Sequence, residues 1–83
     1  MSPELAQWIV DKGFALVGLD MLTDGLPNLP THRILLGAGV YILECITNYD
    51  AIPDGTSMLT LITAPLPLAH MEAAPVRAML IQD

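Results

Sequence analysis

The chain has 83 residues, of which 53% are hydrophobic and 14% charged, and its formal net charge is −6. Its three basic residues, Lys12, Arg33 and Arg77, cannot form the positive surface that nucleic acids and anionic membranes require, so we expect neither partner. The longest apolar run is shorter than the ~20 residues of a membrane-spanning helix, and the start MSPELAQ does not have the pattern of a signal peptide. The length predicts one small domain over residues 1–83.

The balance of apolar and charged residues predicts association. Soluble domains carry about 25% charged residues on average, and a small domain has too much surface for so few charges to cover. We therefore expect a homo-oligomer, most simply a dimer, in which each copy covers apolar strands of the other. The single cysteine, Cys45, permits no intrachain disulfide, which fits a cytoplasmic protein.

The first predicted element is a helix. Ser2 is typical of a helix cap, and Gly13 is typical of a helix end. Between them, Leu5, Trp8 and Ile9 have the spacing of an apolar stripe on one face of a helix.

A strand and a loop are predicted next. Residues 14–19 form a continuous apolar run that is too short for a helix, which indicates a strand covered on both faces, as in parallel or mixed sheets. Asp20 lies at the carboxyl end of this strand, where α/β proteins bind ligands. It is either a metal ligand, a residue that orients a metal-binding histidine through a hydrogen bond, or a cap of the following turn. Residues 21–30 form a loop in which Asp24 and Gly25 signal a turn.

The central segment predicts a helix, a bend and a strand. Thr31 is the expected N-cap of a short helix over residues 32–36. The sequence Gly37-Ala38-Gly39 predicts a bend, and residues 40–47 read as a strand.

Glu44 stands out in this predicted strand because its neighbours are apolar. Strand side chains alternate between faces, so Glu44 shares a face with Val40, Ile42 and Ile46, and Cys45 points to the other face as a small core residue. A buried carboxylate requires a cation or a hydrogen-bond donor. His32 and Arg77 are the candidate partners, although Arg77 is also compatible with an exposed position.

The remainder of the chain predicts two further strands. Residues 48–55 form a turn-rich connection with one helical turn, residues 57–65 a strand, residues 70–75 a loop that holds His70, and residues 76–82 the last strand. The expected fold is α/β, a mixed β-sheet with one main N-terminal helix and a short second helix. One helix cannot cover both faces of such a sheet, so one face is left for another partner.

The sequence LPTHRILLGAGVYILECITNYDAIP resembles the C-terminal part of the cyclase family of metal-dependent hydrolases, which includes kynurenine formamidases and isatin hydrolases. The shared pattern is a histidine, a short leucine-rich turn, a glycine-rich bend, a strand that carries a glutamate, and an Asn-x-Asp-x-(Ile/Leu)-Pro segment. The resemblance covers nearly the whole chain and implies part of the swivelling β/β/α fold of that family.

The resemblance also implies a metal site. The family's histidine and glutamate, which complete a zinc or manganese site, fall on His32 and Glu44. Asp20 and Arg77 would then orient or pair with these ligands. The His-x-Gly-Thr-His-x-Asp-x-Pro segment that supplies the family's other ligands is absent, so we expect no metal bound to this chain alone. Without the resemblance, a histidine and a glutamate twelve residues apart favour a structural pair without metal.

Three functions follow from this resemblance. The leading hypothesis is a non-catalytic, self-associating remnant of a metal-dependent amide hydrolase. The first alternative is half of a hydrolase similar to kynurenine formamidase, active on N-formylkynurenine only with a partner chain that carries the missing N-terminal ligands. The second alternative is a small-ligand-binding protein.

Overall fold

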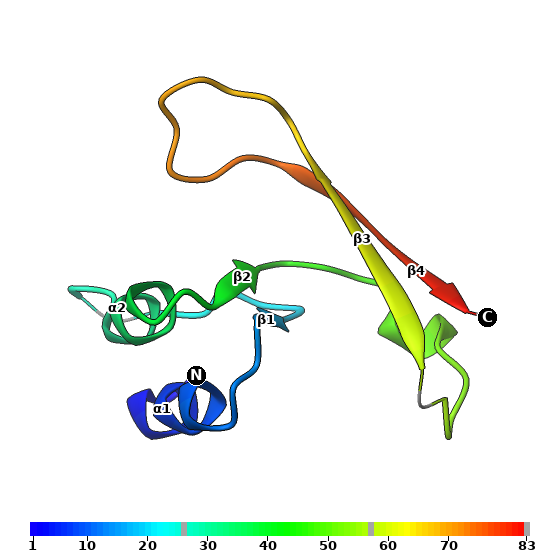
Figure 1. Cartoon of the computed structure of the whole chain (residues 1–83), viewed down its shortest axis with the longest axis horizontal. Helices are drawn as coiled ribbons and strands as arrows, with labels where there is room; N and C mark the ends of the chain where they lie inside the picture. Colours follow the sequence, from blue (N-terminus) through cyan, green and yellow to red (C-terminus); the bar gives the residue numbers. More distant parts are fainter. Residues whose placement is uncertain (26, 57, 83) are drawn as a thin grey trace. The chain divides into compact units, whose positions relative to one another are not determined.

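The computed structural model describes residues 1–25, 27–56 and 58–82, in two compact units that span residues 1–47 and 48–83. The first unit contains α1 (Pro3–Asp11), β1 (Leu16–Gly18), α2 (Pro30–Gly37) and β2 (Tyr41–Leu43), and the second contains η1 (Tyr49–Ala51), β3 (Leu59–Pro65) and β4 (Val76–Gln82) (Figure 1). β1 and β2 pair in parallel, and β3 and β4 pair antiparallel. The predicted mixed α/β class is confirmed, with these strands in two two-stranded sheets. The prediction of a single domain over residues 1–83 stays a prediction.

Helix α1 begins and ends where the sequence predicts. The Ser2 hydroxyl accepts a hydrogen bond from the Leu5 amide at 3.1 Å, which satisfies one of the amide groups left free at a helix start. Gly13 follows the helix with φ +78°, a left-handed conformation that costs glycine little.

The buried face of α1 differs from the predicted stripe. Ala6 is fully buried and Ile9 nearly so, whereas Leu5 and Trp8 are about half exposed. Ala6 and Ile9 pack with Leu35 of α2 and with Val40 in the core of the first unit. The small side chain of Ala6 therefore marks the contact with α2, a fact that the spacing of large apolar residues cannot reveal.

Helix α2 starts one residue earlier than the predicted cap. Leu29, with φ +47°, is the N-cap residue and supplies no side-chain cap, so the prediction of Thr31 as N-cap is wrong. The carboxylate of Asp24 instead accepts hydrogen bonds from the amides of Thr31 (3.2 Å) and His32 (2.8 Å). The helix ends before Gly39, which has φ +80°.

Strand β2 is shorter than the predicted strand over residues 40–47. It ends at Leu43, and Cys45 adopts φ +56°, which interrupts the regular extended backbone. Glu44 therefore follows the strand rather than lying within it. Cys45 is exposed, so its prediction as a core residue is wrong for the same reason.

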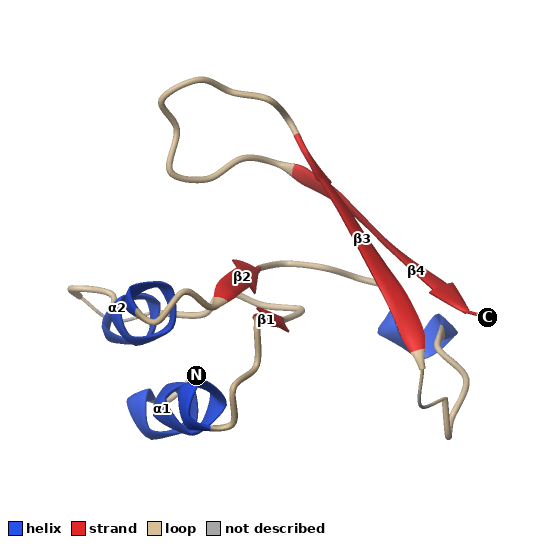
Figure 2. Ribbon diagram, viewed as in Figure 1, coloured by secondary structure: helices blue, strands red, loops and turns tan. Residues whose placement is uncertain are grey.

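The second unit is a long β-hairpin preceded by a short 3₁₀ turn (Figure 2). The turn at Tyr49–Ala51 falls where one helical turn is expected. β3 begins at Leu59, and residue 57, the first residue of the predicted strand, lies outside the described residues. None of the residues that the structure describes between 48 and 82 is buried. In the described part of the chain, every helix is too short or too polar to cross a membrane.

Candidate metal site

The structure brings His32 and Glu44 together and adds Asp24 to them. The Nδ1 atom of His32 lies 2.8 Å from Oδ2 of Asp24, and its Nε2 atom lies 3.4 Å from Oε1 of Glu44. The exposed fractions of these side chains are 25% for His32, 1% for Asp24 and 28% for Glu44. We call these three residues the histidine–carboxylate cluster. The expected contact between Glu44 and His32 is present, although Glu44 is only partly buried.

Each member of the cluster is positioned by a different segment of the first unit. His32 lies in the first turn of α2, and Asp24 lies in the loop that precedes this helix. Glu44 directly follows β2, where its Oε1 atom accepts a hydrogen bond from the Thr23 amide at 2.8 Å. Within this loop, Thr23 thus binds the Glu44 carboxylate, and Asp24 binds the first turn of α2.

Hydrogen bonds keep both carboxylates of the cluster ionised. Burial alone would raise the pKa of Asp24, but the hydrogen bonds from Thr31 and His32 outweigh it and hold that pKa far below its usual range. Burial likewise raises the pKa of Glu44, but the hydrogen bond from the Thr23 amide, together with the charge that His32 carries when it is protonated, outweighs it, so the net shift is downward. At neutral pH the cluster therefore contains two negative charges beside one imidazole.

The donor atoms fit part of a metal site. An imidazole nitrogen and a carboxylate oxygen are ordinary ligands of zinc and manganese, and His32 Nε2 and Glu44 Oε1 face each other across 3.4 Å. Next to them, the buried hydroxyl of Thr23 has no hydrogen-bond partner among the described residues. Within the described ranges, no group of three or more His, Cys, Asp or Glu side chains could hold a metal ion. The cluster thus supplies two ligand positions, and the metal-ligand role of His32 and Glu44 stays a prediction.

The other predicted site residues lie outside the cluster. Asp20 is exposed, two residues after β1, and takes no part in the hydrogen bonds that hold His32 and Glu44. Arg77 is exposed on β4, in the second unit, and its pairing with Glu44 stays a prediction. His70 is exposed in the loop between β3 and β4, where the sequence predicts it.

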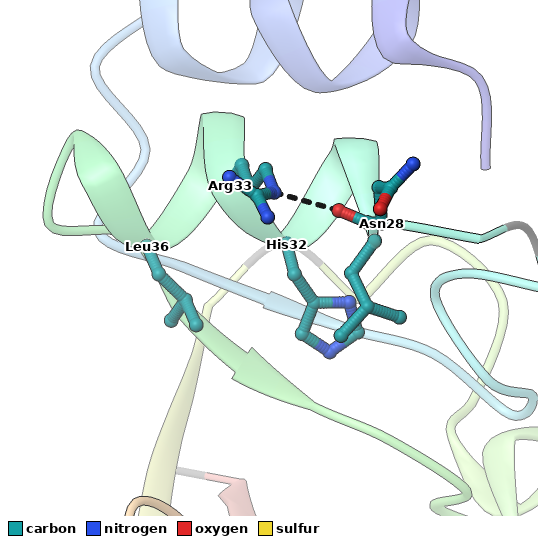
Figure 3. Close-up of a pocket in the computed structure, with 5 residues that line it drawn as sticks. Asn28, His32, Arg33 and Leu36 are labelled. Carbon is teal, nitrogen blue, oxygen red and sulfur yellow. Dashed lines mark hydrogen bonds between the residues drawn. The ribbon is translucent and has the colours of Figure 1, made fainter.

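An open pocket of about 460 Å³ lies beside the cluster. It is lined by residues of α2 and of the turn before it: Asn28, Leu29, His32, Arg33 and Leu36. Figure 3 shows the His32 ring extending from α2 on the same side as Leu36. The Arg33 Nε atom donates a hydrogen bond to the Asn28 carbonyl oxygen at 2.7 Å, so a backbone contact holds this guanidinium at the pocket.

Comparison with solved structures gives the class of protein to which this fold corresponds. A structure described as a potential metal-dependent hydrolase with cyclase activity matches with a TM-score of 0.81 and 33% sequence identity, over 95% of this chain and 39% of that one. The described structure is therefore part of a cyclase-type metal-dependent hydrolase fold, and the resemblance to that family is confirmed.

The curated relatives are kynurenine formamidases. The chain is 32% identical to that of Bordetella petrii, over 95% of this chain and 38% of the relative. It is 34% identical to that of Polaromonas naphthalenivorans and 35% identical to that of Geobacillus thermodenitrificans, over 36% and 38% of their lengths. The chain thus spans less than two fifths of the length of these relatives. No family model matches the chain.

Proposed function

We propose that this chain is a self-associating part of a cyclase-type metal-dependent hydrolase that has no hydrolase activity by itself. A bound zinc or manganese ion would supply a Lewis acid and an activated water for amide hydrolysis. A catalytic zinc is held by three protein ligands, whereas the cluster directs two donors, His32 Nε2 and Glu44 Oε1, toward one point. This shortage of ligands is the observation that carries the proposal.

A second candidate function is a hydrolase half that works with a partner chain. It is favoured by the intact surroundings of the two donors. Asp24 is 1% exposed and contacts His32 at both its backbone and its ring, and Glu44 is held by the Thr23 amide. A partner that carries the His-x-Gly-Thr-His-x-Asp motif would add the missing ligands, and the relatives suggest formamides such as N-formylkynurenine as the substrate class.

One experiment separates these two functions. The purified chain is assayed for hydrolysis of N-formylkynurenine and for bound zinc and manganese, first alone and then mixed with a polypeptide that carries the missing motif. The first function predicts no turnover and less than stoichiometric metal in both samples. The second predicts turnover in the mixture that is lost in His32→Ala and kept in His70→Ala, the matched control. Turnover by the chain alone would contradict both.

The hairpin β3–β4 supports the proposed self-association. One of its faces carries the facing pair Leu61 and Leu80, and the other carries Ile62 and Met79. All four side chains are at least 39% exposed, and an isolated two-stranded hairpin is marginally stable in water. Because both faces of the hairpin carry apolar residues, we expect other protein surfaces to bury both faces.

We propose a second copy of this chain as the partner of the hairpin. Arg77 is the one charged residue in β3 and β4, so two hairpins can approach without extensive repulsion even though the chain carries a net charge of −6. The interface of an obligate dimer is above ~2,000 Å² in total, which requires most of the hairpin.

Light scattering over a dilution series tests this proposal. We expect a dimer at micromolar concentration and a shift to monomer in Ile62→Asp, which places a charge on one apolar face. His70→Asp, at an exposed position in the loop between β3 and β4 and outside both strands, is the control and should remain dimeric. A stable folded monomer of the unaltered chain at micromolar concentration would overturn the proposal.

A further inference from the structure

We infer that Asp24 is a positioning residue, which fixes the proton of His32 on Nδ1 and thereby presents the Nε2 lone pair toward Glu44. This inference rests on the proposed ligand role of His32 and Glu44, because Nε2 would then be the metal-binding atom. Asp24 itself contacts neither the substrate nor the metal position. Its action passes entirely through the imidazole ring of His32.

The geometry around Asp24 leaves its carboxylate little freedom to move. Its Oδ1 atom accepts the Thr31 amide at 3.2 Å, and its Oδ2 atom accepts the His32 amide at 2.8 Å. The same Oδ2 atom lies 2.8 Å from Nδ1 of His32. Because the start of α2 supplies two of these contacts, the carboxylate moves together with the helix that carries His32. The side chain is 1% exposed, so water does not compete for these positions.

The chemistry of this contact selects one tautomer of the imidazole. An ionised carboxylate can only accept hydrogen bonds, and a neutral imidazole has one donor and one acceptor nitrogen. In the neutral ring Nδ1 therefore carries the proton, and Nε2 keeps its lone pair. A carboxylate that orients a histidine in this way is the usual neighbour of a metal-binding imidazole.

The distance on the other side of the ring agrees with this assignment. Nε2 of His32 and Oε1 of Glu44 are 3.4 Å apart, longer than the ~2.7–2.9 Å of a charge-assisted hydrogen bond. In the neutral ring two acceptor atoms face each other, and both can bind the same cation. The open pocket beside His32 provides access to the ring.

The alternative role of Asp24 is that of a helix cap alone. A cap would stabilise α2 without any effect on which imidazole nitrogen carries the proton. The tautomer of His32 therefore separates the two roles, whereas stability does not.

Nitrogen-15 NMR of the two imidazoles measures this tautomer directly in the metal-free protein, at a pH at which both rings are neutral. His70, exposed in the hairpin loop, is the internal reference and should show the Nε2–H form that dominates in free neutral imidazole. We expect the Nδ1–H form for His32 and a shift toward Nε2–H in Asp24→Asn, because an amide can place a donor opposite Nδ1. Asp20→Asn, at an exposed position, should leave His32 unchanged. An Nε2–H form of His32 in the unaltered chain would overturn the inference, and this measurement depends on no variant.

A zinc titration followed through the His32 signals separates this inference from the proposed ligand role. We expect Asp24→Asn to weaken zinc binding about 10–100-fold, the usual effect of removing such a neighbour, and Asp20→Asn to have no effect. If zinc does not bind while the tautomer shifts as expected, the positioning role stands and the ligand role fails. If zinc binds both proteins equally and the tautomer is unchanged, the ligand role stands and the positioning role fails.

Discussion

Replacement of Glu44 by alanine tests how strongly the cluster stabilises the first unit. The Glu44 carboxylate accepts the Thr23 amide at 2.8 Å, and a hydrogen bond to a charged group contributes ~1.5–3 kcal/mol. The contact with His32 is longer, at 3.4 Å, and the Glu44 side chain is 28% exposed, so solvent screening limits its contribution to ~1 kcal/mol or less. We therefore expect Glu44→Ala to lower the free energy of unfolding by ~2–3 kcal/mol. A fully buried ion pair broken from one side would cost ~3–5 kcal/mol.

The same residue should contribute to acid sensitivity. The pKa of Glu44 is lowered in the folded state from its ordinary value of 4.5. A carboxyl group with a lowered pKa contributes stability that is present above its unfolded pKa and is lost as the pH falls through the folded one. The unaltered chain should thus lose stability below about pH 4.5, and Glu44→Gln should lose less over the same range.

Urea unfolding followed by the fluorescence of Trp8 measures both effects, since Trp8 lies in the same unit as Glu44. Glu72→Ala is the matched control. Its side chain is exposed between β3 and β4, and removal of an exposed acid there should change stability by ~0.5 kcal/mol or less. The reasoning fails if Glu44→Ala is as stable as Glu72→Ala, or if Glu44→Gln is as acid-sensitive as the unaltered chain.

Three further predictions use neighbouring positions as internal controls. Leu35→Ala should cost ~2–5 kcal/mol because Leu35 is fully buried, whereas Leu36→Ala, at a side chain that is 56% exposed, should cost little in the same urea assay. Gly39→Ala should cost ~1–2 kcal/mol because φ is +80° there, whereas Gly37→Ala, with open space around it and no positive φ, should be neutral or stabilising in thermal unfolding. The exposed thiol of Cys45 should react with a thiol reagent in the folded protein, and protection until unfolding would contradict its placement.

Local signals in the sequence predicted both ends of α1, but they did not predict its buried face or the end of β2. Ser2 and Gly13 act through their own backbone neighbours, so their roles at the two ends of α1 could be read from the sequence. The buried face of α1 depends instead on which side α2 approaches, and Ala6 gives no sign of this contact before the fold is known. The early end of β2 depends on Cys45, whose positive φ is uncommon for a residue other than glycine and has no sequence signal.

The candidate site likewise depends on contacts that local sequence signals do not reveal. His32 and Glu44 came from the family resemblance, because a spacing of twelve residues carries no information about contact. Asp24 was interpreted as part of a turn, yet it contributes the shortest side-chain contact of the cluster. The start of α2 was the one sequence feature that could have indicated this role of Asp24. Since Leu29 and Pro30 have no side-chain acceptor, the first amides of the helix need one from elsewhere, and Asp24 is the nearest acidic residue in the sequence.

The charge of the cluster is the feature that stability alone does not account for. Two carboxylates flank one imidazole, and the charge of Asp24 acts against the ionisation of Glu44. A neutral His32 would need only one carboxylate in a structural pair, and a second one adds repulsion. A divalent cation between Nε2 and Oε1 would offset that repulsion and use both acceptor atoms. With His32 neutral, the excess of negative charge thus favours the proposed ligand role of His32 and Glu44 over a purely structural contact.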